Sequence, residues 1–174
     1  MIRATAFLVT LFLGTAALAD DGVRVVMSTS HGDIEIDLYT DKAPVTAGNF
    51  LKLVDDGLLD GGTFYRVVSY ENDRGSPKIE VIQGGRAGSL EGDVDAIDHE
   101  TTEQTGILHT DGAISMARDG VGTATSEFFI VIGDQPGLDH GEARNADMQG
   151  FAAFGMVVSG MDVVRKIQGL AADG

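Results

Sequence analysis

Apolar and polar residues alternate along several short stretches of the chain, which is the pattern of β-strands with one buried face. A turn at His31-Gly32 separates the first two stretches, as in a hairpin. Two later stretches are expected to pair around Asp111-Gly112. The pattern predicts strands at residues 23–29, 33–39, 63–69, 79–85, 106–109, 113–117, 128–132 and 151–158.

Two other segments have apolar residues at the spacing of one helix face. In residues 44–54, Pro44 suits the first helical position, where its missing N–H costs nothing. In residues 159–168, Ser159 and Asp162 resemble a capping box. Many strands, two helices near opposite ends of the chain and no alternating βαβ pattern predict an antiparallel barrel or sandwich.

Residues 112–133 place a loop of small residues directly before two adjacent aromatic residues, Phe128 and Phe129. Side chains alternate between the two faces of a strand. We therefore expect Phe128 to pack inward and Phe129 to point outward into a groove.

The first residues of the chain have the pattern of an export signal. Arg3 precedes an apolar segment at residues 6–13 and then a small-residue site at Ala17-Leu18-Ala19, which predicts a secretory signal peptide at residues 1–19 and one domain at 20–174. The alternative, a membrane anchor, is disfavoured because the apolar run is shorter than the roughly 20 residues that span a bilayer. We expect a product secreted across the inner membrane into the periplasm, with no membrane contact after cleavage.

Composition narrows the classes of function. With 174 residues the chain is expected to form one domain with a substantial core, and its 24 Gly and 3 Pro favour tight turns between short strands. The net charge of −15 argues against nucleic acid as a partner, because phosphate binding needs clustered basic residues. The absence of Cys excludes disulfides, thiolate nucleophiles and sulfur metal ligands.

The sequence offers no obvious nucleophile or metal cage. Ser115 and Ser126 lack the G-x-S-x-G setting of a hydrolase, and no Asp/His pair has a usable spacing. His109 lies at a strand end, where we expect it to bond the backbone. No H-x-x-x-H pair occurs among the four histidines, His31, His99, His109 and His140.

An acidic run at residues 93–100 superficially resembles a calcium loop. However, Ile97 occupies the third ligand position and no Gly follows it, so a charged surface loop is the favoured interpretation. A divalent-ion site is the weaker alternative.

Five stretches, taken together and in their order along the chain, resemble the cyclophilin family of peptidyl-prolyl isomerases. The resemblance implies a mainly β fold, a closed eight-stranded antiparallel β-barrel capped by two α-helices, with the active groove on its outer surface. It also implies an isomerase that acts on proline-containing segments without a cofactor, and we expect a monomer. The stretches are FYRVV at 64–68, IQGG at 82–85, GAISMA at 112–117, SEFFI at 126–130 and FAAFGMVVSGMDVVRKI at 151–167.

Carried over residue by residue, the resemblance assigns catalysis to Arg66, Gln83 and Phe129. Arg66 would stabilise the twisted X-Pro amide, and Gln83 would orient the peptide. Phe129 and Leu138 would hold the proline ring. The substrate-binding positions implied are Val81, Ala117, Arg118, Glu127, Leu138 and Phe151.

Each of these residues also has a structural interpretation. Arg66 without its flanking motifs would be an exposed strand arginine in a surface salt bridge, and the others would be packing residues. By the two-residue period of a strand, Phe64 and Val68 should share the outward face of Arg66.

The chain departs from the family at the proposed pocket. These departures leave open a second function, a non-catalytic proline-peptide-binding module or holdase. They are Glu80-Val81 in place of an aromatic residue and Met, Glu127 in place of Gln, Gly137 in place of a large aromatic residue, Phe151 in place of His, and longer segments at 69–78 and 139–150.

Overall fold

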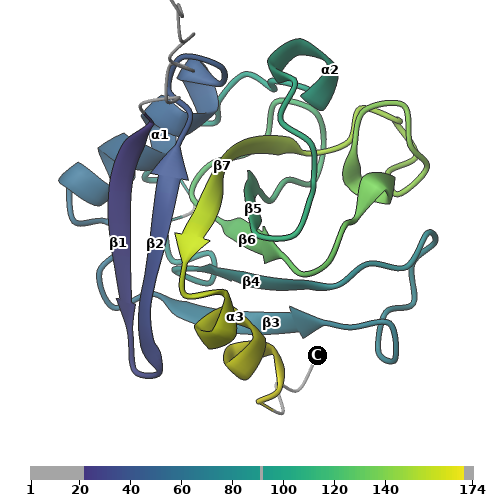
Figure 1. Cartoon of the computed structure of the whole chain (residues 1–174). Helices are drawn as coiled ribbons and strands as arrows, with labels where there is room; N and C mark the ends of the chain where they lie inside the picture. Colours follow the sequence, from purple (N-terminus) through teal and green to yellow (C-terminus); the bar gives the residue numbers. More distant parts are fainter. Residues whose placement is uncertain (1–21, 91, 171–174) are drawn as a thin grey trace, which may run out of the picture.

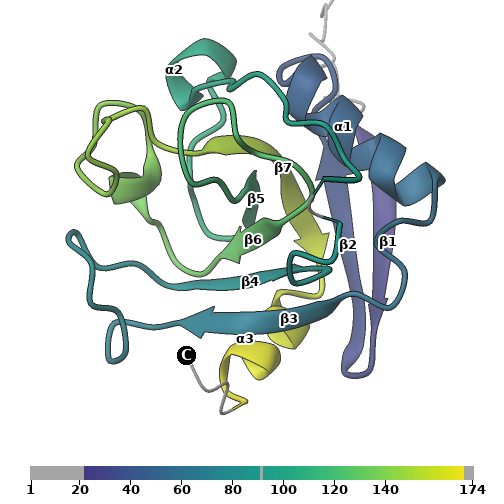
Figure 2. The same ribbon diagram turned by 180° about the vertical axis from the view of Figure 1, so that it is seen from behind.

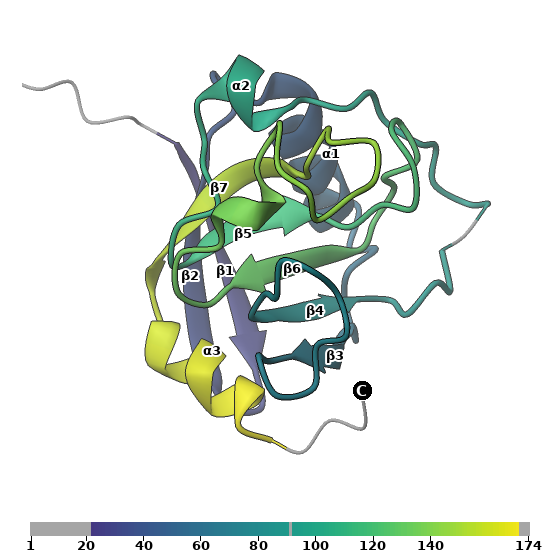
Figure 3. The same ribbon diagram turned by 90° about the vertical axis from the view of Figure 1, so that its right-hand side faces the viewer.

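The computed structural model describes residues 22–90 and 92–170, so the predicted signal peptide lies outside the described residues. The described strands form one seven-stranded sheet in the order β1-β2-β7-β5-β6-β4-β3, and every pair is antiparallel. The sheet curls round, with α1 and α3 at opposite ends (Figures 1 and 3). The elements are β1 (Val23–Thr29), β2 (Gly32–Leu38), α1 (Pro44–Asp55), β3 (Thr63–Val68), β4 (Val81–Gly85), α2 (Thr102–Thr105), β5 (Ala113–Met116), β6 (Phe128–Val131), the 3₁₀ helix η1 (Pro136–Leu138), β7 (Ala152–Ser159) and α3 (Met161–Gln168).

The mainly β, antiparallel architecture is confirmed, but a closed barrel of eight strands is not. Residues 106–109, expected as a strand, bond elsewhere: the His109 N–H donates to Asp139 Oδ1 (3.1 Å), and its carbonyl accepts from the Gln135 N–H (2.8 Å). The seven described strands therefore form a curled half-barrel that is open between β1 and β3. A cleft of about 760 Å³ lies there, lined by residues of both strands.

Alternating side chains divide the apolar residues into two clusters. The main core lies inside the curl, where the Phe50 ring of α1 packs against Phe128 (5.4 Å between centroids) and Phe154 (5.2 Å). The smaller outer cluster contains Val68, Ile79, Val81, Ala113, Phe129, Val131 and Leu138. The adjacent rings of β6 thus face opposite sides of the sheet, as the alternation predicts.

Most predicted elements differ from the observed ones by one or two residues at an end, and two of these differences change a turn or a cap. The β1–β2 turn is Ser30-His31, and Gly32 (φ +131°) is already the first residue of β2. Ser159 ends β7 and caps nothing, because α3 begins after Gly160, whose φ of +93° favours glycine. None of the helices in the described part of the chain is long and apolar enough to cross a membrane.

The acidic run at residues 93–100 contributes a helix cap. Glu100 Oε1 accepts the N–H of Val45 (3.1 Å), and Oε2 accepts the N–H (2.8 Å) and hydroxyl (2.7 Å) of Thr46, at the start of α1. The helix has no side-chain cap of its own at Ala43. Across the described ranges, no group of three or more His, Cys, Asp or Glu could hold a metal ion, so a divalent-ion site finds no support there.

Replacing Glu100 by Ala should therefore destabilise the fold. We expect E100A to lower the free energy of unfolding by about 1–2 kcal/mol, the usual cost of losing an N-terminal cap. Urea unfolding measures this change, and E142A, which removes an exposed glutamate, is the control. Equal losses in the two variants would contradict the capping role.

Candidate functional site

A cleft of about 610 Å³ opens on the outer face of the sheet, beside β3, β4 and β6. Its sides come from the β5–β6 connection and from the segment between η1 and β7. All nine residues proposed for the site line this one cleft: Arg66, Val81, Gln83, Ala117, Arg118, Glu127, Phe129, Leu138 and Phe151.

The floor of the cleft is apolar and rigid. The Phe129 side chain projects outward from β6, yet the residue is only 4% exposed because its neighbours cover it. The Phe151 ring meets it edge to face with 5.3 Å between centroids, and Leu138 belongs to the same cluster. Such a surface can hold a small apolar ring.

Arg66 and Gln83 are the polar centre of the cleft. They are cross-strand partners on β3 and β4, and Arg66 Nη1 donates to Gln83 Oε1 at 2.9 Å. The Gln83 Nε2 donates in turn to the Tyr65 hydroxyl, also at 2.9 Å. One glutamine side chain therefore contacts two consecutive residues of the neighbouring strand.

A β-bulge makes this double contact possible. The register between β3 and β4 shifts between Phe64 and Arg66, which leaves Tyr65 as the extra residue. Phe64 consequently packs against the main core, with its ring 6.0 Å from that of Phe128. The expected outward position of Phe64 is therefore wrong, while Val68 does belong to the outer cluster.

Tyr65, which the sequence did not single out, fixes the orientation of Gln83. Burial, followed by the neighbouring Glu127 carboxylate, raises the pKa of Tyr65 to about 12, so the hydroxyl keeps its proton at neutral pH. The amide nitrogen of Gln83 can only donate, so Nε2 is the atom that bonds the Tyr65 hydroxyl. The amide oxygen of Gln83 is then left facing Arg66. In a regular strand, Tyr65 would lie on the face opposite to Arg66. Strand alternation in the sequence therefore could not reveal that Tyr65 belongs to the site.

Comparisons with known proteins identify the family to which the chain belongs. Residues 24–174 match the sequence profile described as cyclophilin type peptidyl-prolyl cis-trans isomerase/CLD. The chain belongs to the cyclophilin family. It is 35% identical over 158 residues to a peptidyl-prolyl cis-trans isomerase of Acinetobacter baylyi, covering 90% of this chain and 77% of that relative. It is 34% identical over 148 residues to peptidyl-prolyl cis-trans isomerase B of Escherichia coli, with 84% and 85% covered.

A solved structure shows the same fold at lower identity. The cyclophilin-type isomerase of Cryptosporidium parvum, crystallised in the presence of the dipeptide Ala-Pro, superimposes with a TM-score of 0.65 at 22% identity. The match covers 84% of this chain and 85% of that chain. The present chain is thus a peptidyl-prolyl cis-trans isomerase with the cyclophilin fold.

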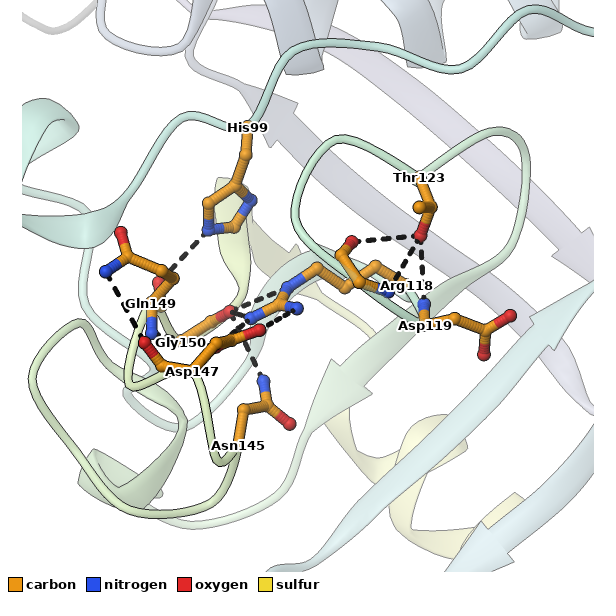
Figure 4. A network of polar contacts seen from close by, with 9 residues as sticks. His99, Arg118, Asp119, Thr123, Asn145, Asp147, Gln149 and Gly150 are labelled. Atoms are coloured by element: carbon orange, nitrogen blue, oxygen red, sulfur yellow. Dashed lines mark hydrogen bonds and ion pairs between the residues drawn. The ribbon is translucent and has the colours of Figure 1, made fainter.

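Arg118 lines the cleft of this cyclophilin, but its guanidinium is already engaged. It binds both carboxylate oxygens of Asp147 (2.8 and 2.9 Å) and the Gly150 carbonyl (2.9 Å from Nε and 2.6 Å from Nη2), as Figure 4 shows. It also lies 5.3 Å from the centre of the Phe151 ring. The side chain is 1% exposed, so Arg118 holds the 139–150 segment against the site. Its hydrogen bonds lower the pKa of Asp147 to about 2.

A buried polar triad, absent from the sequence-based list, lies beneath the Phe129 ring. His109 bonds Asp139 Oδ1 through Nδ1 (2.7 Å) and Ser115 Oγ through Nε2 (2.9 Å), and its ring stacks on Phe129 at 6.0 Å. The expectation that the His109 side chain bonds the backbone is therefore wrong, because its partners lie on other elements. Ser115 is 0% exposed and cannot attack a substrate, so the triad supports the floor of the cleft.

The His109 triad makes stability depend on pH. Burial lowers the pKa of His109, an effect that Asp139 opposes, whereas histidine in an unfolded chain titrates near about 6.5. Below that pH the unfolded chain binds a proton that the native protein does not. Stability should therefore fall as the pH drops, by up to about 1.4 kcal/mol per pH unit from this residue. Thermal melts at several pH values measure this effect, with H31Q as the control. The melting temperature of H109Q should fall less steeply with decreasing pH than that of wild type or H31Q. Equal slopes of melting temperature against pH in all three proteins would contradict this account.

Tyr65→Phe tests the orientation of Gln83. Without the hydroxyl, Gln83 Nε2 loses its acceptor and Arg66 alone holds the amide, so the acceptor of Arg66 is less firmly positioned. We expect kcat to fall about fivefold, which corresponds to one hydrogen bond of about 1 kcal/mol, with KM unchanged. Y70F, which removes a half-exposed hydroxyl outside the cleft, is the control in a protease-coupled proline-peptide assay. Wild-type kcat in Y65F would disprove the role of Tyr65.

Proposed function

We propose that this isomerase accelerates X-Pro rotation through Arg66, with Gln83 orienting the peptide and Phe129 and Leu138 holding the proline ring. Rotation about a peptide bond loses amide resonance, across a barrier of about 18–20 kcal/mol for ordinary peptide bonds. In the twisted state the prolyl nitrogen regains its lone pair and becomes a better hydrogen-bond acceptor. A guanidinium aimed at that nitrogen stabilises the transition state more than the planar ground state.

The contact between Arg66 and Gln83 is the observation that carries this proposal. The guanidinium is exposed at the cleft and is held by one neutral amide, and no ion pair with a carboxylate involves it among the described residues. Most of its N–H groups remain available to a substrate. The surface salt bridge considered for Arg66 therefore has no support in the described part of the chain.

The proposed substrates are proline-containing segments of unfolded or flexible exported proteins, met in the periplasm by a monomeric enzyme. The predicted signal peptide supports export, and the Ala-Pro dipeptide used with the Cryptosporidium parvum relative supports the substrate class. Uncatalysed X-Pro isomerisation takes tens to hundreds of seconds, so folding of such proteins would benefit from a catalyst.

Arg66→Ala separates catalysis from binding. We expect R66A to lower kcat/KM by about 10²–10³-fold, the usual effect of removing a group that stabilises developing charge. R24A, which removes an exposed arginine on β1 away from the cleft, should keep the wild-type rate. The readout is the protease-coupled assay with a proline peptide.

The alternative of a non-catalytic binding module gives a different result. Peptide would bind in the cleft, but neither wild type nor R66A would raise the isomerisation rate appreciably above the uncatalysed rate. Equal, high rates in R66A and wild type would instead remove Arg66 from the mechanism.

A further inference from the structure

The two segments that lengthen this chain relative to its family are joined by a buried ion pair. Arg144, in the 139–150 segment, donates to both carboxylate oxygens of Asp73 in the 69–78 segment, at 2.8 and 3.0 Å. Arg144 Nη1 also donates to the Pro77 carbonyl at 2.8 Å. Figure 2 shows the β3–β4 and η1–β7 connections on the same side of the molecule.

Asp73 is the centre of this junction. Besides Arg144, its carboxylate accepts the backbone N–H groups of Gly75 (2.9 Å) and Ile79 (2.8 Å), and its side chain is 3% exposed. These hydrogen bonds outweigh burial and lower the pKa of Asp73 to about 2, so the carboxylate stays charged at physiological pH. Two of its three partner residues, Ile79 and Arg144, line the cleft.

The same junction fills the space beside Gly137, the position at which the resemblance implies a large aromatic residue in the family. Gly137 carries no side chain, and a Cβ there would overlap the ring of Pro77. Gly75 has no room for a Cβ either, because the Arg144 guanidinium lies over it. Pro77 therefore occupies the space that a residue larger than glycine at position 137, next to Leu138, would need.

We propose that Asp73 and Arg144 are positioning residues that build the wall of the proline pocket in place of the missing aromatic residue. This inference deepens the proposed function and rests on it for the location of the proline ring. Asp73 holds Ile79 and Arg144 at the rim of the cleft, and the junction keeps Pro77 against Gly137, next to Leu138. The wall is thus assembled from two segments far apart in sequence, while Arg66 and Gln83 lie on the sheet and, among the described residues, share no hydrogen bond or ion pair with Asp73 or Arg144.

The expected signature is a change in KM without a change in kcat. A displaced wall weakens the binding of ground state and transition state equally, because the atoms that stabilise the twisted amide stay in place. We expect D73N and R144A to raise KM on the order of tenfold and to keep kcat within about twofold of wild type. R144K, which keeps the charge but not the two parallel hydrogen bonds, should give an intermediate KM.

The control is a second Arg–Asp pair of similar geometry. Arg24 bonds both carboxylate oxygens of Asp37 at 2.7 and 3.0 Å on the β1–β2 hairpin, away from the cleft. D37N should leave KM and kcat unchanged. A purely structural role for Asp73 would lower the melting temperature and the active fraction of D73N, but not alter the KM of the folded molecules.

Steady-state kinetics on a proline peptide decide between these outcomes. Wild-type KM in both R144A and R144K would overturn the proposal, even if D73N does not fold. A raised KM in both, with kcat kept, would support it. Failure of the arginine mechanism appears separately, as wild-type kcat in R66A, and leaves the KM comparison valid.

Discussion

Phe128 and Phe129 project to opposite faces of β6, so this one strand contributes a ring to each apolar cluster of the protein. On one side Phe128 packs with Phe50 and Phe64 in the main core, and on the other Phe129 packs with Phe151. The core and the floor of the cleft are therefore built on the two faces of one strand. The His109 triad lies directly beneath Phe129, so its position and that of the loops that line the cleft depend on β6 and the strands beside it.

How much the sequence could predict depended on the range of the interactions. Strand alternation and the apolar face of α1 are local patterns, and the elements they indicated are present except the strand at residues 106–109. Residues 106–109 were mispredicted because His109 bonds Asp139 and Gln135, which lie far along the chain. The family resemblance named residues that now line one cleft, but it could not show that the Arg118 guanidinium is already engaged. The pair of Asp73 and Arg144, separated by 71 positions, leaves no trace in any local spacing.

Arginine has two distinct uses around the cleft of this acidic protein. Arg118 and Arg144 each bind a carboxylate and hold a loop in place, so their charge is neutralised within the structure. Arg66 instead bonds the neutral amide of Gln83, and no carboxylate of the described residues pairs with it. A protein of net charge −15 thus keeps one guanidinium uncompensated at the polar centre of an apolar cleft. The charge remains available where a substrate nitrogen would gain electron density.

The bulge at Tyr65 has a consequence for how this site could arise and change. An added residue in a regular strand exchanges the faces of every residue beyond it, which would bury Arg66 and expose Val67. A bulge absorbs the added residue, so Phe64 and Val67 both remain in the core while Tyr65 and Arg66 share the outer face. A single-codon insertion is then enough to add a functional group beside an existing one. The ancestry of such a strand can include a change of length that leaves its packing intact.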